Sequence, residues 1–405
     1  MSGAMSGKRF KRARMRFLLS CMKFPTEPGL SYLTNELAQA LVAEGHEVEV
    51  LLIDWDAAPQ TADATSIDWN GIRVVRCTPR LLRGFGRLLA HASKFVLTGR
   101  HAGRVARTQF DLARFDSLVA WSPALAFAPF VGAICRAGIA RRLLIIWDFF
   151  PDHHREIGLI PSGPPYWIAR AWEQHLMNAF TTFICTLPQN ADYLRRKFRV
   201  RPEQDVRVTP IWSDAAPVPP ADRAATRRLH DLPLDGPIAV FGGQLVEGRG
   251  FEQMLAAAAA GRAQGSKLTF LFVGDGRLAP MLRAAAHANV LWRPAMKRDA
   301  YLALLGACDV GMVATVPGVS SFTIPSKTLD YLRAGLPVVA AVEAGSDFSA
   351  LLEQYGVGRA VPFGDADGFL QVAEALAAGP GVEAAAQRCL EEVFHVRRAV
   401  AAVTA

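Results

Sequence analysis

The stretch SSFTIPSKTLDYLRAGLPVVAAV, residues 320–342, predicts an amphipathic helix that stops at Gly335 and leads into a buried strand. Ser326 and Lys327 stand at the start of this helix, and Asp330 lies one turn inside it. A helix start has unpaired N–H groups and the positive end of the helix dipole, so a lysine there favours an anion such as phosphate. Taken alone, the stretch fits a helix cap with two solvated charges equally well.

The chain around this stretch alternates between predicted strands and helices. Residues 15–54 predict a strand, a helix and a second strand, and the pattern starts again after the proline-rich segment SDAAPVPPADR, residues 213–223. Strands that alternate with helices at this spacing form parallel, doubly wound sheets. The sequence therefore predicts an α/β protein with two such domains, whose facing strand ends form a ligand-binding cleft.

The predicted domain organisation divides the 405 residues into five segments. The last of them is a helix that could return to the first domain. The segments are a basic tail (1–14), a first domain (15–212), a linker (213–236), a second domain (237–385) and a C-terminal helix (386–405).

Composition indicates a globular protein, because 51% of its residues are hydrophobic and 20% are charged. The six cysteines are far apart in the sequence, which argues against a zinc or disulfide framework and suits a reducing compartment. The apolar run FLLSCM, residues 17–22, is too short for a secretory signal or a membrane span. We therefore expect a protein that is cytoplasmic or peripheral to a membrane.

The net charge of +8 comes from the first half of the chain. Residues 69–110 contain nine Lys or Arg and no acidic residue, and residues 80–100 (RLLRGFGRLLAHASKFVLTGR) interleave these with Leu and Phe. This composition is typical of an interfacial helix on anionic lipid, although an ordinary surface helix with a basic face is the alternative. Nucleic acid is disfavoured as a partner, because neither clustered stacking aromatics nor a recognition motif is present.

Several motifs in family order show that the sequence resembles the family 4 retaining glycosyltransferases. These enzymes have the GT-B fold of two facing Rossmann-like domains, and the resemblance spans residues 15 to about 380. The most specific motifs are FVGDG (272–276) and PSKTLDYLRAGLPVVA (325–340). The others are GHEVEVLL (45–52), WDFFPDHHREIGLI (147–160) and FGGQLVEGRGFEQMLAA (241–257).

This resemblance implies a nucleotide-sugar site in the second domain. Ser326 and Lys327 would receive the donor's diphosphate, and Asp330 would hold the ribose hydroxyls. The loop with Gly243, Gln244 and Arg249 would lie on the other side of the diphosphate, which makes Arg249 and Lys327 its counter-charges. Arg293, in the segment LWRP (291–294), is the candidate for base binding. Transfer in this family needs no metal, and we predict no metal site and no cofactor.

The sequence departs from the family pattern eight residues before Asp330, where many members have a glutamate that contacts the donor sugar. This chain has Phe322 there. Phenylalanine accepts no hydrogen bond, so the donor sugar could be deoxygenated or acetamido-substituted on that edge, or be held by Ser320 and Ser321.

In the first domain, the segment DFFPDHHRE (148–156) follows an apolar strand and would face the cleft. We predict Asp148, His153 and His154 as catalytic candidates together with Arg249 and Lys327, with Asp148 favoured over either histidine. Each histidine alone fits a surface or capping role better. Asp152, and Gly29 in the loop FPTEPGL (24–30), are expected to border the acceptor.

The function predicted first is transfer of a sugar, with retention, from a nucleotide diphosphate donor to a lipid-linked glycan in cell-envelope polysaccharide assembly. The first domain would bind the acceptor and the second the nucleotide sugar, at the inner face of the cytoplasmic membrane. The alternatives are a nucleotide-sugar 2-epimerase of the same fold and a non-catalytic sugar-nucleotide-binding scaffold on the membrane. An epimerase has a soluble substrate and needs no basic, acid-free stretch.

Overall fold

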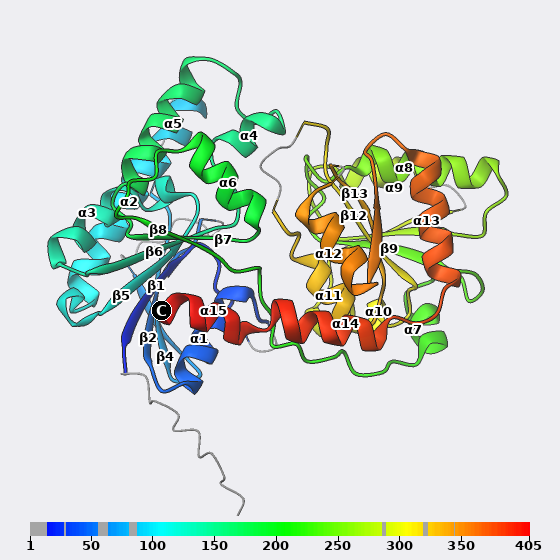
Figure 1. The fold of residues 1–405 in the computed structure, drawn as a ribbon, viewed down its shortest axis with the longest axis horizontal. Helices are drawn as coiled ribbons and strands as arrows, with labels where there is room; N and C mark the ends of the chain where they lie inside the picture. Colours follow the sequence, from blue (N-terminus) through cyan, green and yellow to red (C-terminus); the bar gives the residue numbers. More distant parts are fainter. Residues whose placement is uncertain are drawn as a thin grey trace, which may run out of the picture.

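The computed structural model describes residues 14–27, 30–55, 64–80, 87–285, 289–318, 323–343 and 345–405. They form two domains side by side, each a sheet covered by helices (Figure 1). The two α/β domains with parallel sheets that the strand and helix pattern predicts are confirmed.

Within the described residues, the first sheet has eight strands in the order β3-β4-β2-β1-β5-β6-β7-β8. Its pairings are parallel except for the antiparallel β3 and β4 at the edge. The strands are β1 (Arg16–Cys21), β2 (Glu47–Ile53), β3 (Thr65–Trp69), β4 (Ile72–Cys77), β5 (Ser117–Trp121), β6 (Arg141–Ile146), β7 (Thr182–Cys185) and β8 (Asp205–Val208).

The second sheet has six strands in the described residues, all paired in parallel, in the order β11-β10-β9-β12-β13-β14. Its central strands β9, β10 and β12 are buried throughout, because helices cover both faces of the sheet. The strands are β9 (Ile238–Gly242), β10 (Thr269–Val273), β11 (Val290–Arg293), β12 (Val310–Ala314), β13 (Val338–Ala341) and β14 (Gly358–Val361).

The helices of the first domain lie on both faces of its sheet (Figure 1). They are α1 (Leu33–Ala43), α2 (Arg87–Gln109), η1 (Leu112–Arg114), η2 (Ala124–Phe127), α3 (Ala128–Ala137), α4 (Asp152–Glu156), α5 (Pro164–Met177) and α6 (Pro188–Lys197). No helix of the described residues is long and apolar enough to cross a membrane.

In the second domain, α8 and α13 pack together on one face of the sheet, while α11 and α14 pack together on the other. The helices after the first domain are α7 (Arg223–Leu229), α8 (Phe251–Ala263), α9 (Ala279–Ala284), α10 (Arg298–Leu305), α11 (Lys327–Arg333), α12 (Asp347–Tyr355), α13 (Ala366–Ala378), α14 (Glu383–Cys389), the π-helix η3 (Leu390–Phe394) and α15 (Val396–Thr404).

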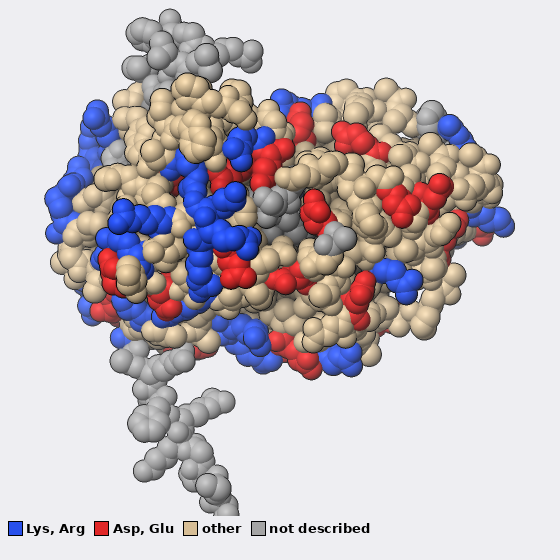
Figure 2. Space-filling view, turned by 45° about the horizontal axis from the view of Figure 1, so that its top comes forward, with Lys and Arg blue, Asp and Glu red and all other residues tan. Residues whose placement is uncertain are grey.

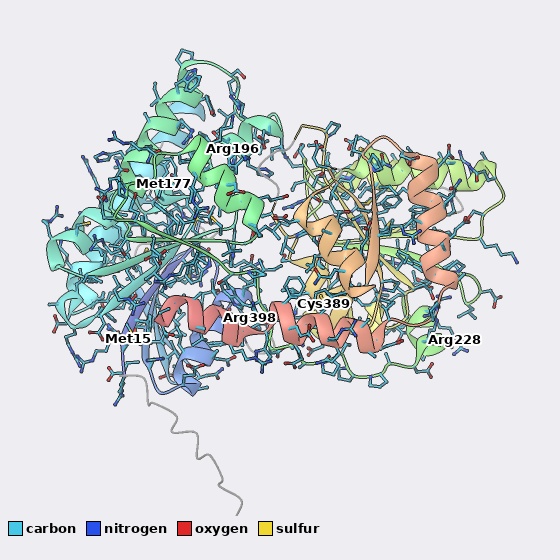
Figure 3. The ribbon with its side chains drawn as sticks, in the orientation of Figure 1. Met15, Met177, Arg196, Arg228, Cys389 and Arg398 are labelled. Atoms are coloured by element: carbon cyan, nitrogen blue, oxygen red, sulfur yellow. The ribbon has the colours of Figure 1, made fainter. Side chains whose placement is uncertain are left out.

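The chain crosses between the domains twice, and the two crossings touch. Ser213 N donates to Phe394 O at 2.7 Å, and Val396 N donates to Ser213 O at 2.8 Å. Beyond this point α15 packs on α1 of the first domain, and the Arg141 guanidinium donates to Val403 O at 2.9 Å. Figure 3 follows this return from Cys389 to Arg398.

Candidate active site

A cavity of about 770 Å³ lies between the two domains at the carboxyl ends of the second sheet's strands. The first domain contributes Tyr32 and Glu36 of the α1 region to its lining. The second contributes the turns after β9 and β10 and the first half of α11. The predicted residues that line the cavity are Gly243, Gln244, Arg249, Ser326, Lys327 and Asp330.

Close backbone contact builds the floor of the cavity. Gly243 and Gly274 follow β9 and β10, with φ of +132° and +147°. A Cβ on Gly274 would lie 1.9 Å from Gly243 O, so only glycine lets the two turns touch. On the other side of β9, Tyr331 accepts from Gly242 N at 3.1 Å and donates to Met312 O at 3.3 Å, which fixes α11 against the strand end.

Lys327 and Arg249 bring two positive charges to this cavity. Burial lowers the pKa of Lys327 to about 7, helped by Arg249 and opposed by Asp330. Its Nζ stands 4.5 Å above the Phe241 ring. Burial also lowers the pKa of Arg249, whereas Tyr32 and Asp148 act to raise it. No carboxylate of the described residues forms an ion pair with either cation. The cavity therefore suits an anion that would be shared by both.

Asp330 is held at the cavity wall by a residue that the motifs do not reveal. Arg298 donates to both carboxylate oxygens of Asp330, at 2.7 and 3.2 Å. Burial alone would lower the pKa of Arg298, but Asp330 raises it overall. Glu36 approaches from the first domain, and burial together with Asp214 raises its pKa to about 8.

Asp148 lies at the end of β6, where Ser122 fixes it. The Ser122 hydroxyl donates to Asp148 Oδ1 at 3.1 Å and accepts from the backbone N–H of Trp147 and of Asp148. Asp148 is not part of the cavity lining, but its charge acts on Arg249 and on Tyr32, both of which line the cavity. The structure thus places the favoured carboxylate near Arg249.

The two histidines follow Asp148 on α4. Burial lowers the pKa of His153, opposed by Asp148, so its imidazole is neutral near pH 7. His154 packs edge-on against Phe150 at 5.1 Å, and its Nδ1 is buried without a hydrogen-bond partner among the described residues. The neutral form of His153 has one ring nitrogen that can serve as a hydrogen-bond acceptor.

Two further predicted residues, Asp152 and Arg293, are held by partners away from the cavity. Asp152 is 2% exposed, accepts from the hydroxyls of Tyr166 and Tyr193 at 2.7 and 2.9 Å, and pairs with Arg170 at 3.3 Å. It ties α4 to α5 and α6 from inside the first domain. The Arg293 guanidinium donates to the carbonyls of residues 230, 231 and 292. It therefore points toward the backbone after α7.

The other predicted positions lie outside the described residues. These are Gly29, the three residues 320–322 and part of the basic stretch 80–100. Among the residues that the structure does describe, no group of three or more His, Cys, Asp or Glu could hold a metal ion.

Comparison with known proteins identifies both domains. Residues 29–212 match the model of the glycosyl transferase 4-like domain, and residues 236–378 match glycosyl transferases group 1. The chain belongs to the glycosyltransferases. It is 26% identical over 353 residues to the putative colanic acid biosynthesis glycosyl transferase WcaI of Escherichia coli K12. The aligned region covers 82% of this chain and 84% of WcaI.

Solved structures show the fold. Sucrose-phosphate synthase from Thermosynechococcus elongatus matches with a TM-score of 0.68 and 17% identity over 96% of both chains. WaaG, a glycosyltransferase involved in lipopolysaccharide biosynthesis, matches with a TM-score of 0.63 and 14% identity over 96% of this chain and 99% of its own. The predicted GT-B fold and glycosyltransferase class are therefore confirmed.

Proposed function

We propose that this glycosyltransferase moves a sugar from a nucleoside diphosphate donor to a lipid-linked glycan, with retention, in cell-envelope polysaccharide assembly. The observation that carries the proposal is the pair Lys327 and Arg249, two cations on one cavity without an ion-pair partner among the described residues. The name of the relative WcaI, which places it in colanic acid biosynthesis, supports a polysaccharide product.

In this proposal the donor's diphosphate lies between the turn at Gly243 and Gln244 and the start of α11 at Ser326. As the glycosidic bond breaks, the leaving diphosphate gains negative charge, which Arg249 and Lys327 stabilise. Asp330 accepts from the ribose hydroxyls through the lone pairs that Arg298 leaves unused.

The acceptor would approach along the first domain. Asp148 and one of the two histidines, His153 or His154, orient its hydroxyl, and an oxygen of the leaving phosphate takes the proton. The incoming oxygen then bonds to the sugar on the face that the phosphate leaves, so the anomeric configuration is retained. This assigns the cluster a positioning role and leaves the charge stabilisation to the second domain.

The proposal places the enzyme at the inner face of the cytoplasmic membrane, where residues 80–100 would contact anionic lipid. Residues 87–100 of this stretch belong to the helix α2, and an interfacial contact with lipid requires a helix there. Reversal of three charges, Arg83→Glu, Arg87→Glu and Lys94→Glu, should make vesicle binding weaker at low salt and leave donor binding unchanged. Equal binding by variant and wild type would remove this contact from the proposal.

The deciding experiment starts from a thermal-shift panel of nucleotide sugars. The stabilising donor, labelled in its sugar, is then incubated with lipid-linked glycans extracted from polysaccharide-producing cells. Label in the lipid extract, with an unchanged anomeric configuration by NMR, supports the proposal. Epimerised donor without transfer would indicate an epimerase, and binding without transfer or hydrolysis would indicate a scaffold.

A further inference from the structure

Helix α5 and the segment before it expose large apolar side chains. Leu159, Trp167, Ile168 and Trp172 are 48%, 63%, 65% and 37% exposed, and we call these four residues the α5 face. Trp172 lies four residues after Ile168, so the two stand on the same side of the helix. Exposed tryptophan is uncommon outside binding surfaces, and two within one helix indicate a partner.

The apolar face points outward because the polar side chains of α5 are used inside the domain. Glu173 is 2% exposed and accepts from Ala124 N and Leu125 N, both at 2.7 Å. Arg170 pairs with Asp152 and lies 3.5 Å from the Phe198 ring centre. Glu173 is therefore buried and Arg170 is only 14% exposed, while the tryptophans of the helix face water, the reverse of an ordinary surface helix.

A basic cluster borders the α5 face. Arg196, Lys197 and Arg199 are exposed, and none has an ion-pair partner among the residues described. The chain after α6 runs along α5, where Gln174 exchanges hydrogen bonds of 2.7 and 3.0 Å with the backbone of Arg199. Figure 3 labels Arg196 on α6, and Figure 2 shows blue side chains gathered on the first-domain half of the molecule.

The segment that leads to the α5 face also borders the active-site cleft. Leu159 follows α4, the helix of His153 and His154. Ile157, between α4 and Leu159, packs against the loop of the second domain that contains Gly248. A Cβ added to Gly248 would lie 3.0 Å from a methyl group of Ile157. A flat surface seated on the α5 face would therefore stand next to the mouth of the cleft.

We propose that the α5 face inserts into the interface of an anionic phospholipid membrane. The two tryptophans enter the boundary between headgroups and acyl chains, and Arg196, Lys197 and Arg199 contact lipid phosphates. The aromatic side chains suit the apolar interior of a bilayer, and the neighbouring cations without ion-pair partners suit its anionic surface. The inference goes beyond the proposed function, since it concerns residues other than 80–100 and requires neither donor nor acceptor.

The test measures binding of the full chain to vesicles made of equal parts phosphatidylglycerol and phosphatidylethanolamine. The variant Trp167→Ser, Ile168→Ser, Trp172→Ser should need at least about tenfold more lipid for half-maximal binding, because three large side chains lose contact with the bilayer. At high salt, where charge contacts are screened, its binding should be lost. The matched control changes two exposed leucines of similar exposure in the second half of the chain, Leu229→Ser and Leu234→Ser, and should bind as wild type does.

A conservative variant separates insertion from loss of folding. Trp167→Phe, Trp172→Phe should retain vesicle binding, and lipids brominated on the acyl chain should quench its remaining tryptophan fluorescence less than that of wild type. A thermal shift with the chosen donor checks that both variants keep the second domain's site.

Three results would overturn the inference. They are failure of wild type to bind these vesicles, equal binding by the serine variant, and a change from dimer to monomer in the serine variant with vesicle binding retained. The last result would assign the α5 face to a second copy of the chain. Failure of donor binding in every variant and in wild type would instead count against the proposed function alone.

Discussion

Lys327 and Arg249 line one cavity, and among the described residues neither forms an ion pair with a carboxylate, which is costly for a buried cation unless an anion binds. Replacing either by Ala should lower kcat by at least about tenfold, which corresponds to about 1.4 kcal/mol of transition-state stabilisation. Steady-state kinetics at saturating donor measure the loss. Lys267→Ala, at an exposed position of the second domain, is the control. Wild-type turnover in both single variants would contradict the assignment of the diphosphate.

The low pKa of Lys327 has a direct consequence for binding. With a pKa of about 7, the side chain is mostly neutral at about pH 8, whereas a bound diphosphate favours the ammonium form. Binding of a nucleoside diphosphate at about pH 8 should therefore take up close to one proton. Calorimetry in buffers of different ionisation enthalpy measures this uptake, which should be absent in Lys327→Met.

The same group affects stability without ligand. The unfolded chain keeps Lys327 protonated up to about pH 10.4, whereas the folded chain releases the proton from about pH 7 upward. The unfolded state binds more protons in this window, so the contribution of Lys327 to stability rises with pH. A Lys327→Met variant that gives the same slope of unfolding free energy against pH would contradict the lowered pKa.

Asp330 and Arg298 should act together on donor affinity. Asp330→Ala should raise the donor KM by about tenfold or more with little change in kcat, since ribose contacts hold the ground and transition states alike. Arg298→Ala should shift KM in the same direction by a smaller factor, because the carboxylate loses its orientation. A fall in kcat at constant KM in Arg298→Ala would mean that Arg298 acts on the reacting phosphate instead.

The sequence predicts the chemical type of the site better than it predicts which residues line it. Lys327, Arg249 and Asp330 could be assigned because a helix start and a glycine turn have fixed geometry. Asp152 and Arg293 could not be placed, because the direction of a side chain after a turn depends on distant partners such as Tyr193 and residues 230–231. Arg298 was missed for the same reason, since it lies 32 residues before Asp330 in the chain.

At the scale of elements, the turn after β9 and the turn after β10 have to touch. Gly274→Ala would set a Cβ 1.9 Å from Gly243 O and should destabilise the protein by at least about 2 kcal/mol, with weaker donor binding. Gly265→Ala is the matched control, because its φ of +73° carries strain but its Cβ meets nothing within 4 Å. Denaturant unfolding compares the two variants. Equal losses would mean that strain, and not contact between the turns, sets the cost.

Elements with continuous apolar runs are those that the sequence predicts well. The runs that become β5, β6, β9, β10 and β12 are buried along nearly their whole length, as is typical of strands in a sheet that helices cover on both faces. The antiparallel pair β3 and β4 carries no such signal. Three of the five residues of β3 are exposed, since it lies at the sheet edge.

At the scale of the whole molecule, two reciprocal hydrogen bonds hold the cleft together away from the crossing point. Gln189 N donates to Asp347 Oδ2 at 2.7 Å, and Asp347 N donates to Gln189 Oε1 at 3.1 Å. Each bond contributes about 1 kcal/mol, so Asp347→Ala with Gln189→Ala should shift the molecule toward open forms by roughly tenfold or more. We expect a larger radius of gyration in solution scattering and a higher donor KM.

The control for this prediction is Asp192→Ala, which removes an exposed carboxylate from the same helix without touching the second domain. An unchanged radius and KM in the double variant would show that the bonds between residues 189 and 347 do not limit opening. The relative arrangement of the two domains is the feature that is hardest to predict from the sequence. It depends on a few such contacts between segments that are far apart in the chain.

The packing of α15 on the first domain has a consequence for how the protein folds during its synthesis. Helix α1 is covered by Val396, Val400 and Val403, which are about 360 residues later in the chain. Ribosomes add about 5–20 residues per second, so the apolar side of α1 waits on the order of tens of seconds for its cover. The nascent first domain should therefore bind chaperones until translation ends, and a fragment that stops before α14 should aggregate where the full chain stays dispersed.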